Sequence, residues 1–324
     1  MRYDCEDWDE VVRLLKEAGD VALACHINPD GDALGSLLGV SLGLRKLGTR
    51  TWPSWGTSPL TPPPAYEFLP GIDSLVQPAD VPETPVFVAL DCGAADRLGE
   101  LEEKATAAPA LINVDHHPGN GNFGTHNIVV THASSTAELA AGLLIDAGIG
   151  IDKDIATALY TGIVTDTGRF QYSNSTPETL RLAADLLELG VSAPDVAIEV
   201  FESAPYGFLK LTGRVLERAV LFEDERFIYS WVDHEDLDET GVAMDETEKL
   251  IDVIRATNVA DVAAIFKEQR SGEYRVSLRS KGPVSVGAIA RARGGGGHEL
   301  AAGFTAKDVH DAARAIRDDL ARDH

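Results

Sequence analysis

The sequence predicts an α/β protein whose first domain is a doubly wound, mostly parallel sheet. Short apolar runs that suit buried strands alternate along the chain with longer segments of helical periodicity. Several of the short runs end directly in acidic or histidine side chains, at the positions where ligands bind to such sheets. A length of 324 residues, of which 44% are hydrophobic, suits about two domains with cores of their own.

The individual elements follow from local patterns. The apolar run 21–25 predicts a strand, and leucines at helical spacing predict a helix over 33–47 that ends before Gly48. Ser135 and Glu138 predict the start of another helix through a capping box. Further strands are expected at 86–90, 111–114, 227–232, 262–266 and 274–279, and further helices at 155–165, 177–189, 246–255 and 309–322.

A change of pattern after Gly190 indicates how the chain is divided. We expect a first domain over 1–190, a helical linker over 191–215 and a smaller second domain over 216–324. The proline-rich segment 57–70 is expected to form an ordered loop or rim. Its residue pattern does not indicate a function for this segment.

Charge and cysteine content exclude several classes of partner. With 28 basic and 52 acidic residues the formal net charge is −24, so most of the surface repels long duplex nucleic acid and anionic membranes. No apolar run approaches the roughly 18 residues of a membrane span. The cysteines number only 3 and predict no disulfide framework, and the pattern of the first residues does not predict a signal peptide. We therefore expect a cytoplasmic protein.

Acidic and histidine side chains gather after the predicted strands. His26, Asp30 and Asp32 follow the first strand, although Asn-Pro-Asp-Gly is also strong turn chemistry. Taken singly, each such residue could be a turn, a cap or a satisfied core histidine. Gathered at one sheet edge, several carboxylates repel one another and are costly to keep ionised unless a cation lies among them. The remaining members of the cluster are Asp91, Asp115, His116, His117 and Asp166.

The composition of this cluster predicts the kind of metal. Carboxylate and imidazole ligands without thiolate suit Mn²⁺, with Mg²⁺, Co²⁺ or Fe²⁺ as alternatives. The ligands are more numerous than one closed site needs, so two metals that share a bridging carboxylate account for them. Such pairs act in phosphoryl displacement.

The second half contains a glycine run and a basic face. Gly294–Gly297 suit a loop whose N–H groups approach a phosphate, with a flexible linker as the alternative. Strand alternation places Arg275, Ser277, Arg279 and Lys281 on one face. Arg279 is the strongest candidate for binding a ligand, and an exposed edge strand is the alternative.

These motifs resemble the DHH phosphoesterase superfamily, which is named for the Asp-His-His at 115–117. The segment 26–32, Asp91 and Asp166 also match the family pattern, in the same order. The second half resembles the DHHA1 domain, whose hallmark is the Gly-Gly-Gly-His run at 295–298. The resemblance covers nearly the whole chain. A two-domain chain of this size is similar to the oligoribonuclease and pAp phosphatase group of the superfamily.

The resemblance implies roles for particular residues. One metal would be held by His26, Asp30 and Asp91, and the other by Asp32, Asp91, His116 and Asp166, so that Asp91 bridges. His117 would act with Asp91 in catalysis and face the substrate phosphate, and Asp115 would orient a histidine. The active site would lie in a cleft between the domains. The substrate-binding residues would be Arg279, Gly295, Gly296, Gly297, His298 and Arg97. For Arg97, an ion pair with Asp96 or Glu100 is the alternative.

The implied function is hydrolysis of short RNA by two Mn²⁺ ions, with Mg²⁺ or Co²⁺ as alternatives. NanoRNA and pApA would yield nucleoside 5′-monophosphates, and pAp would yield AMP. Cyclic di-AMP, or inorganic pyrophosphate, is an alternative substrate for the same chemistry. A catalytically inactive nucleotide sensor is an alternative of another class. The sequence does not decide the oligomeric state, and a homodimer is one possibility.

Overall fold

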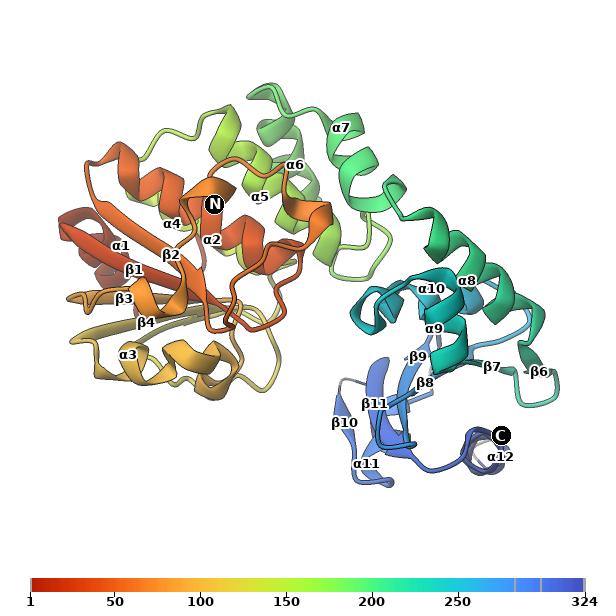
Figure 1. The fold of residues 1–324 in the computed structure, drawn as a ribbon. Helices are drawn as coiled ribbons and strands as arrows, with labels where there is room; N and C mark the ends of the chain where they lie inside the picture. The colour runs from red at the N-terminus through yellow and green to blue at the C-terminus, as the bar shows by residue number, and fades with distance from the viewer. Residues whose placement is uncertain (1, 283, 298, 323–324) are drawn as a thin grey trace. The chain divides into compact units, whose positions relative to one another are not determined.

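The computed structural model describes residues 2–282, 284–297 and 299–322. Contacts between residues divide the chain into two compact units, Met1–Ser203 and Ala204–His324 (Figure 1). Each unit has its own sheet and its own hydrophobic core.

The first unit is built on a parallel sheet of 5 strands in the order β2-β1-β3-β4-β5. These strands are β1 (Asp20–Cys25), β2 (Arg50–Trp55), β3 (Val86–Leu90), β4 (Ala110–Asp115) and β5 (His126–Val129). The strand order reverses between β1 and β3, and open α/β sheets bind their ligands at such a switch point. Cys25 and Leu90, which end these two strands, are paired in register. The residues that follow them therefore begin side by side.

Helices cover both faces of this sheet, as the sequence predicts for a doubly wound fold. Leu23 and Val88 belong to one apolar cluster, whereas their strand neighbours Ala22 and Phe87 belong to another. In Figure 1, α2 and α4 lie on one face and α3 on the other. The helices of this unit are α1 (Trp8–Glu17), α2 (Gly31–Lys46), α3 (Glu102–Ala107), α4 (Thr136–Asp146), α5 (Lys153–Asp166), α6 (Pro177–Glu188) and α7 (Ala193–Ala197).

The structure corrects several local expectations in this unit. The structure contains three elements that the sequence patterns did not predict: the strands β2 and β5 and the helix α1. Both missed strands lie at the edges of the sheet, and β5 is short and polar, so apolar periodicity does not report them. The oxygen Oγ of Ser135 accepts from the N–H of Glu138 at 3.1 Å, as in a capping box. The Glu138 carboxylate, however, accepts from Ser134, Thr179 and Tyr3.

The segment after α6 is helical but irregular. It contains α7, the π-helical turn η5 (Ile198–Glu202) and α8 (Tyr206–Glu217). The division between the two units falls at Ser203 and Ala204, just before α8.

The second unit contains a mixed sheet of 6 strands in the order β10-β11-β9-β8-β7-β6. Its strands are β6 (Val220–Phe222), β7 (Phe227–Val232), β8 (Val262–Glu268), β9 (Tyr274–Ser280), β10 (Gly296–Gly297) and β11 (Ala301–Ala306). Its helices, besides α8, are α9 (His234–Thr240), α10 (Leu250–Arg255), α11 (Val286–Arg291) and α12 (Val309–Leu320). The helix expected over 246–255 is divided, because the 3-10 segment η6 (Met244–Lys249) precedes α10.

Candidate metal centre

The turn between β1 and α2 places the first group of candidate ligands. His26 follows β1, and Asp30 is the N-cap of α2. The oxygen Oδ1 of Asp30 accepts from the N–H groups of Asp32 and Ala33, both at 3.1 Å. This cap satisfies orphan donors of the helix and holds the Asp30 carboxylate at the sheet edge. Its side chain is 61% exposed, so it stays accessible to a ligand.

Asp91 occupies the centre of the cluster. It follows β3 directly and has a left-handed backbone with φ of 59°, a conformation that non-glycine residues adopt at a cost. Its N–H donates to the carbonyl of Val114 at 2.9 Å, which ties the turn to β4. The oxygen Oδ2 of Asp91 lies 3.5 Å from Nε2 of His26. Its oxygen Oδ1 lies 3.8 Å from Nε2 of His116.

The start of α4 supplies contacts to two of these acids. The N–H of Thr136 donates to Oδ2 of Asp32 at 2.7 Å, and the N–H of Ala137 donates to Oδ1 at 2.8 Å. The hydroxyl of Thr136 donates to Oδ1 of Asp91 at 2.9 Å. The positive end of a helix therefore faces the buried Asp32 carboxylate. Thr136 was not predicted as a site residue.

The loop after β4 contributes two histidines with different surroundings. His117 lies against Asp115, with 2.8 Å between Nδ1 and Oδ1. This contact raises the pKa of His117 to about 9. Burial instead lowers the pKa of His116, and its Nε2 is buried without a hydrogen-bond partner in the described part of the chain. That nitrogen lies 3.8 Å from Asp32 and 3.5 Å from Asp166.

Asp166 completes the cluster from a helix rather than from a strand. It is the last residue of α5, and its carboxylate accepts from Nδ2 of Asn174 at 3.3 Å. The same nitrogen donates to the carbonyl of Ser134 at 2.8 Å. Asn174 therefore connects the end of α5 to the segment that precedes α4.

The structure brings all the predicted metal ligands together. Within each of three groups, the ligand atoms lie no more than 4.8 Å apart. These groups are His26, Asp30 and Asp91; Asp32, His116 and Asp166; and Asp91, His116 and His117. Asp91 belongs to two of the groups and His116 to two, so the groups adjoin one another.

Burial and mutual repulsion shift the pKa values of the clustered acids. Burial and the charges of Asp91 and Asp30 raise the pKa of Asp166 to about 8. Burial and the charges of Asp91, Asp166 and Asp30 raise the pKa of Asp32 well above its usual range. Burial opposes the ionisation of Asp91 also, but its contact with His26 and the nearby histidines lower its pKa to about 2. Divalent cations would relieve this crowding, and the unpartnered Nε2 of His116 suits a metal ligand.

The proline-rich segment, to which the sequence assigned no role, reaches this turn. Tyr66, in the short 3-10 segment η1 (Pro64–Tyr66), lies near Asp30 at the start of α2. Burial and the nearby Asp30 raise the pKa of Tyr66 above its ordinary value. Arg97 lies close by in the chain fold: its carbonyl accepts from the N–H of Ile27 at 2.9 Å, and its side chain is exposed.

The last two residues of the glycine run in the second unit form a paired strand rather than a flexible linker. Gly296 and Gly297 form β10 against Gly303 and Ala302 of β11. A Cβ on Gly295 would lie 2.1 Å from the carbonyl oxygen of Gly303, whereas one on Gly296 would meet nothing within 4 Å. Close packing thus requires Gly295, and Gly296 has open space beside it. The predicted substrate residue His298 lies outside the described residues.

Arg279 lies on β9, in a cationic neighbourhood that the sequence only partly indicated. The predicted basic face continues onto β8, where Lys267 pairs in register with Arg275. Lys267 is buried, and Nζ lies 2.7 Å from Oε1 of Glu248. Burial lowers the pKa of Lys267. A lysine at the end of the apolar run Ala263–Phe266 was the available signal for this residue.

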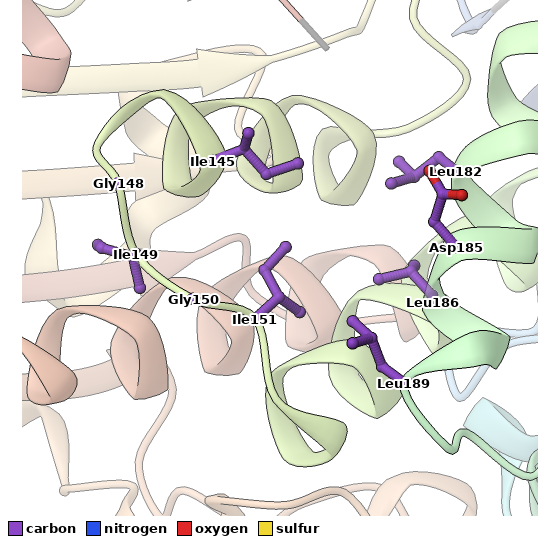
Figure 2. Close-up of a pocket in the computed structure, with 9 residues that line it drawn as sticks. All are labelled: Ile145, Gly148, Ile149, Gly150, Ile151, Leu182, Asp185, Leu186 and Leu189. Atoms are coloured by element: carbon purple, nitrogen blue, oxygen red, sulfur yellow. The ribbon is translucent and has the colours of Figure 1, made fainter.

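The first unit also contains an apolar pocket of about 340 Å³ (Figure 2). Aliphatic side chains from the end of α4, the following loop and α6 line it, with Asp185 at the rim. It shares no lining residue with the acid and histidine cluster. Over the residues that the structure describes, none of the helices is both long and apolar enough to cross a membrane.

Comparison with known proteins agrees with this arrangement. Residues 20–163 match the N-terminal domain of the DHH family, and residues 224–322 match the DHHA1 domain. A bifunctional oligoribonuclease and PAP phosphatase NrnA from Thermus thermophilus is 33% identical over 325 residues, covering 97% of this chain and 95% of the relative. The protein of the same name from Bacillus subtilis is 28% identical, covering 95% of this chain and 96% of the relative.

A solved structure shows the same fold over nearly the whole chain. An exopolyphosphatase-related protein from Bacteroides fragilis superposes with a TM-score of 0.91 at 24% identity, covering 99% of this chain and 98% of that one. The matched domains, the full-length relatives and the clustered ligands agree with one another. The chain therefore belongs to the DHH family of metal-dependent phosphoesterases and carries a DHHA1 domain in its second unit.

Proposed function

We propose that this chain hydrolyses short oligoribonucleotides to nucleoside 5′-monophosphates and converts pAp to AMP. The observation that carries the proposal is the convergence of Asp32, Asp91, His116 and Asp166 at one edge of the sheet. The chain shares nearly its full length with relatives named for these two activities.

We assign two divalent metals to the cluster, Mn²⁺ in preference to Mg²⁺ or Co²⁺. His26, Asp30 and Asp91 would hold one, and Asp32, Asp91, His116 and Asp166 the other. Two of the three groups of adjacent ligand atoms support this division. Metals bound there would acidify the attacking water and neutralise charge on the phosphoryl group.

The chain's own residues position these ligands and the substrate. Thr136 and the start of α4 hold Asp91 and Asp32 in place. We propose that His117, whose ring is fixed by Asp115 at 2.8 Å, faces the substrate phosphate or its leaving oxygen. A histidine that is charged at neutral pH would stabilise the negative charge that develops there.

We propose that the DHHA1 unit binds the nucleotide through Arg279, Gly295, Gly296, Gly297 and His298, and that Arg97 adds a phosphate contact in the first unit. Lys267 and Arg275 on the same pair of strands support this role, because basic side chains stand out in a chain of net charge −24, although both also pair with Glu248. The free thiols Cys5, Cys25 and Cys92 suit a reducing compartment, so we also propose that the enzyme acts in the cytoplasm.

A turnover panel tests the substrate. Purified protein with Mn²⁺ is offered pApA, a twenty-nucleotide RNA, pAp, cyclic di-AMP and pyrophosphate in parallel. We expect turnover of pApA and pAp, and slower turnover per molecule of the long RNA, since a long polyanion is repelled by the acidic surface. Turnover of pyrophosphate or cyclic di-AMP alone would refute the proposed substrate class, and turnover of none would support the inactive sensor.

Metal removal tests the cofactor. We expect EDTA to abolish turnover while circular dichroism keeps its native form, because the ligands lie at the sheet edge and not in the apolar cores. Added Mn²⁺ should restore the rate. An undiminished rate after exhaustive chelation would contradict a metal-dependent reaction.

A further inference from the structure

Asn120 makes an unusually dense set of contacts beside the proposed catalytic histidine. Its amide nitrogen Nδ2 lies 2.6 Å from Oδ2 of Asp115, 2.9 Å from Oδ1 of Asn113 and 3.0 Å from the carbonyl of Cys92. Its oxygen Oδ1 accepts from the N–H of Asn122 at 2.7 Å. Since acceptors surround the nitrogen and a donor faces the oxygen, the hydrogen-bond network defines the orientation of this amide.

These contacts join the loops that follow two neighbouring strands. Nδ2 of Asn113, on β4, donates to the same Cys92 carbonyl at 3.1 Å. The N–H of Gly121 donates to the carbonyl of Gly93 at 3.0 Å. The loop after β4 is thereby fastened to the turn that contains Asp91, whose backbone is left-handed. A strained turn of this kind persists only where its surroundings hold it.

The carboxylate of Asp115 is shared between two partners. It is fully buried, with Oδ1 facing Nδ1 of His117 at 2.8 Å and Oδ2 facing Asn120. A carboxylate held at one oxygen only can rotate about its last bond. With Asn120 on Oδ2, the oxygen Oδ1 stays directed at His117.

We propose that Asn120 is a positioning residue that fixes Asp115 and, through it, the ring of His117. The inference rests on the proposed role of His117 in the reaction. The side-chain contacts above do not include any residue that we assign to the metals, and the backbone N–H of Asn120, which a substitution keeps, donates to the His117 carbonyl at 3.4 Å. The side chain therefore acts through Asp115. Loss of such a supporting residue typically costs about 10–100-fold in activity.

A double-mutant cycle separates this role from a general structural one. Asn120→Ala, His117→Ala and the double variant are assayed with pApA and Mn²⁺. We expect Asn120→Ala to lower kcat about 10–100-fold with a smaller change in KM. In the His117→Ala background the same substitution should have less than about a threefold effect, because residues that act as a unit are not additive. Multiplicative effects would overturn the proposal.

Asn127→Ala is the matched control. Asn127 also stabilises this loop, since its Oδ1 accepts from the N–H of Gly124 at 3.0 Å and its Nδ2 donates to the Gly124 carbonyl at 2.9 Å. It makes no contact with Asp115 among these bonds. We expect its kcat to stay close to that of the parent protein. An equal loss of kcat in both variants would assign Asn120 to loop stability and overturn the proposal.

A second readout needs neither metal nor turnover. In the metal-free protein, the proton on Nδ1 of His117 should give a downfield resonance while Asp115 holds it. We expect Asn120→Ala to shift or broaden this resonance and Asn127→Ala to leave it in place. An unchanged resonance would refute the positioning role even if His117→Ala is inactive. Full activity of His117→Ala would instead refute the proposed role of His117.

Asn120→Ser is prepared alongside, so that the test does not depend on one variant that could fail to fold. A serine keeps a single hydrogen-bond donor but is too short to reach all three acceptors. We expect its kcat and its resonance to lie between those of the parent and the alanine variant. A serine variant with lower kcat than the alanine variant would contradict the proposal.

Discussion

The hydroxyl of Thr136 donates a hydrogen bond of 2.9 Å to the carboxylate of Asp91. Through its N–H, the same residue holds Asp32 at 2.7 Å. One fully buried residue at the start of α4 therefore orients two carboxylates, one from the turn after β3 and the other from the first turn of α2. Because a carboxylate must point its lone pairs correctly to bind a metal, this contact should influence metal affinity.

Thr136→Val tests that relationship by removing the hydroxyl while keeping the branched shape. We expect Mn²⁺ affinity to fall about 10–100-fold. We also expect the metal-free protein to lose about 1.5–3 kcal/mol of unfolding free energy, the range for hydrogen bonds to charged groups. Calorimetric titration and urea unfolding would measure these two effects. Thr136→Ser should retain most of both, and the exposed Thr106→Val should change neither, since that hydroxyl bonds only to its own helix.

Asp91→Ala should abolish turnover more completely than the loss of any other single ligand. We assign Asp91 to both metals and each of the other ligands to one, and Asp91 joins two groups of adjacent ligand atoms whereas His26 joins one. We expect the rate to fall by more than about 100-fold, beyond the usual effect of a residue that merely supports a ligand. Bound metal should also fall, as measured by elemental analysis. His26→Ala is the comparison, and Asp20→Ala, at the opposite end of β1 from the cluster, is the control. A fully active Asp91→Ala protein would end the bridging assignment.

The metal-free protein should become less stable as the pH rises from about 5 to 9. The pKa of Asp166 is raised from 3.8 to about 8, so the folded state binds more protons than the unfolded state between these values, and stability falls with rising pH. The pKa of His117 is raised from 6.5 to about 9, and its contribution is likewise lost as the pH rises through 9. Asp91, with its pKa lowered to about 2, loses its contribution only in strong acid.

Urea unfolding at pH 5, 7 and 9 in EDTA would measure this dependence. The decline should be shallower in Asp166→Asn, which has no carboxyl to ionise. Saturating Mn²⁺ should stabilise the parent most at high pH, because metal and protons compete for the same ligands. A parent protein as stable at pH 9 as at pH 5 in EDTA would contradict the proposed crowding of charge.

The glycine run allows folding and binding to be separated. Gly295→Ala should destabilise the protein by about 1–3 kcal/mol, since its Cβ would overlap the Gly303 carbonyl. Gly296→Ala should change stability by less than about 0.5 kcal/mol, because nothing lies within 4 Å of the new atom. If the substrate approaches the open side of Gly296, the KM for pApA should rise in this stable variant. An unchanged KM would remove Gly296 from the binding residues.

Local pattern was sufficient to predict much of the centre. The runs that became β1, β3 and β4 are apolar and end in polar residues, and parallel strands place their carboxyl ends at one sheet edge. His26, Asp91 and Asp115 could therefore be expected to meet. The residue types alone predicted the kind of metal that these side chains suit. Edge strands such as β5, which has His126 and Asn127 in its first positions, gave no such signal.

Tertiary packing decided which partners the side chains take. Glu138 matches a capping box by spacing, yet its carboxylate serves Ser134, Thr179 and Tyr3, because the packing of α4 brings those hydroxyls to it.

Packing also decided the partners of Thr136 and Asn120. Thr136 bonds to Asp91, which is distant in the chain, and Asn120 bonds to Asp115, because the loop after β4 folds back on itself. Periodicity records only whether a position is buried, whereas a hydrogen bond depends on two atoms within about 3 Å at a suitable angle. The sequence by itself therefore predicted the candidate ligands and the sheet edge at which they meet. The residues that hold those ligands in place became recognisable only once the chain was folded.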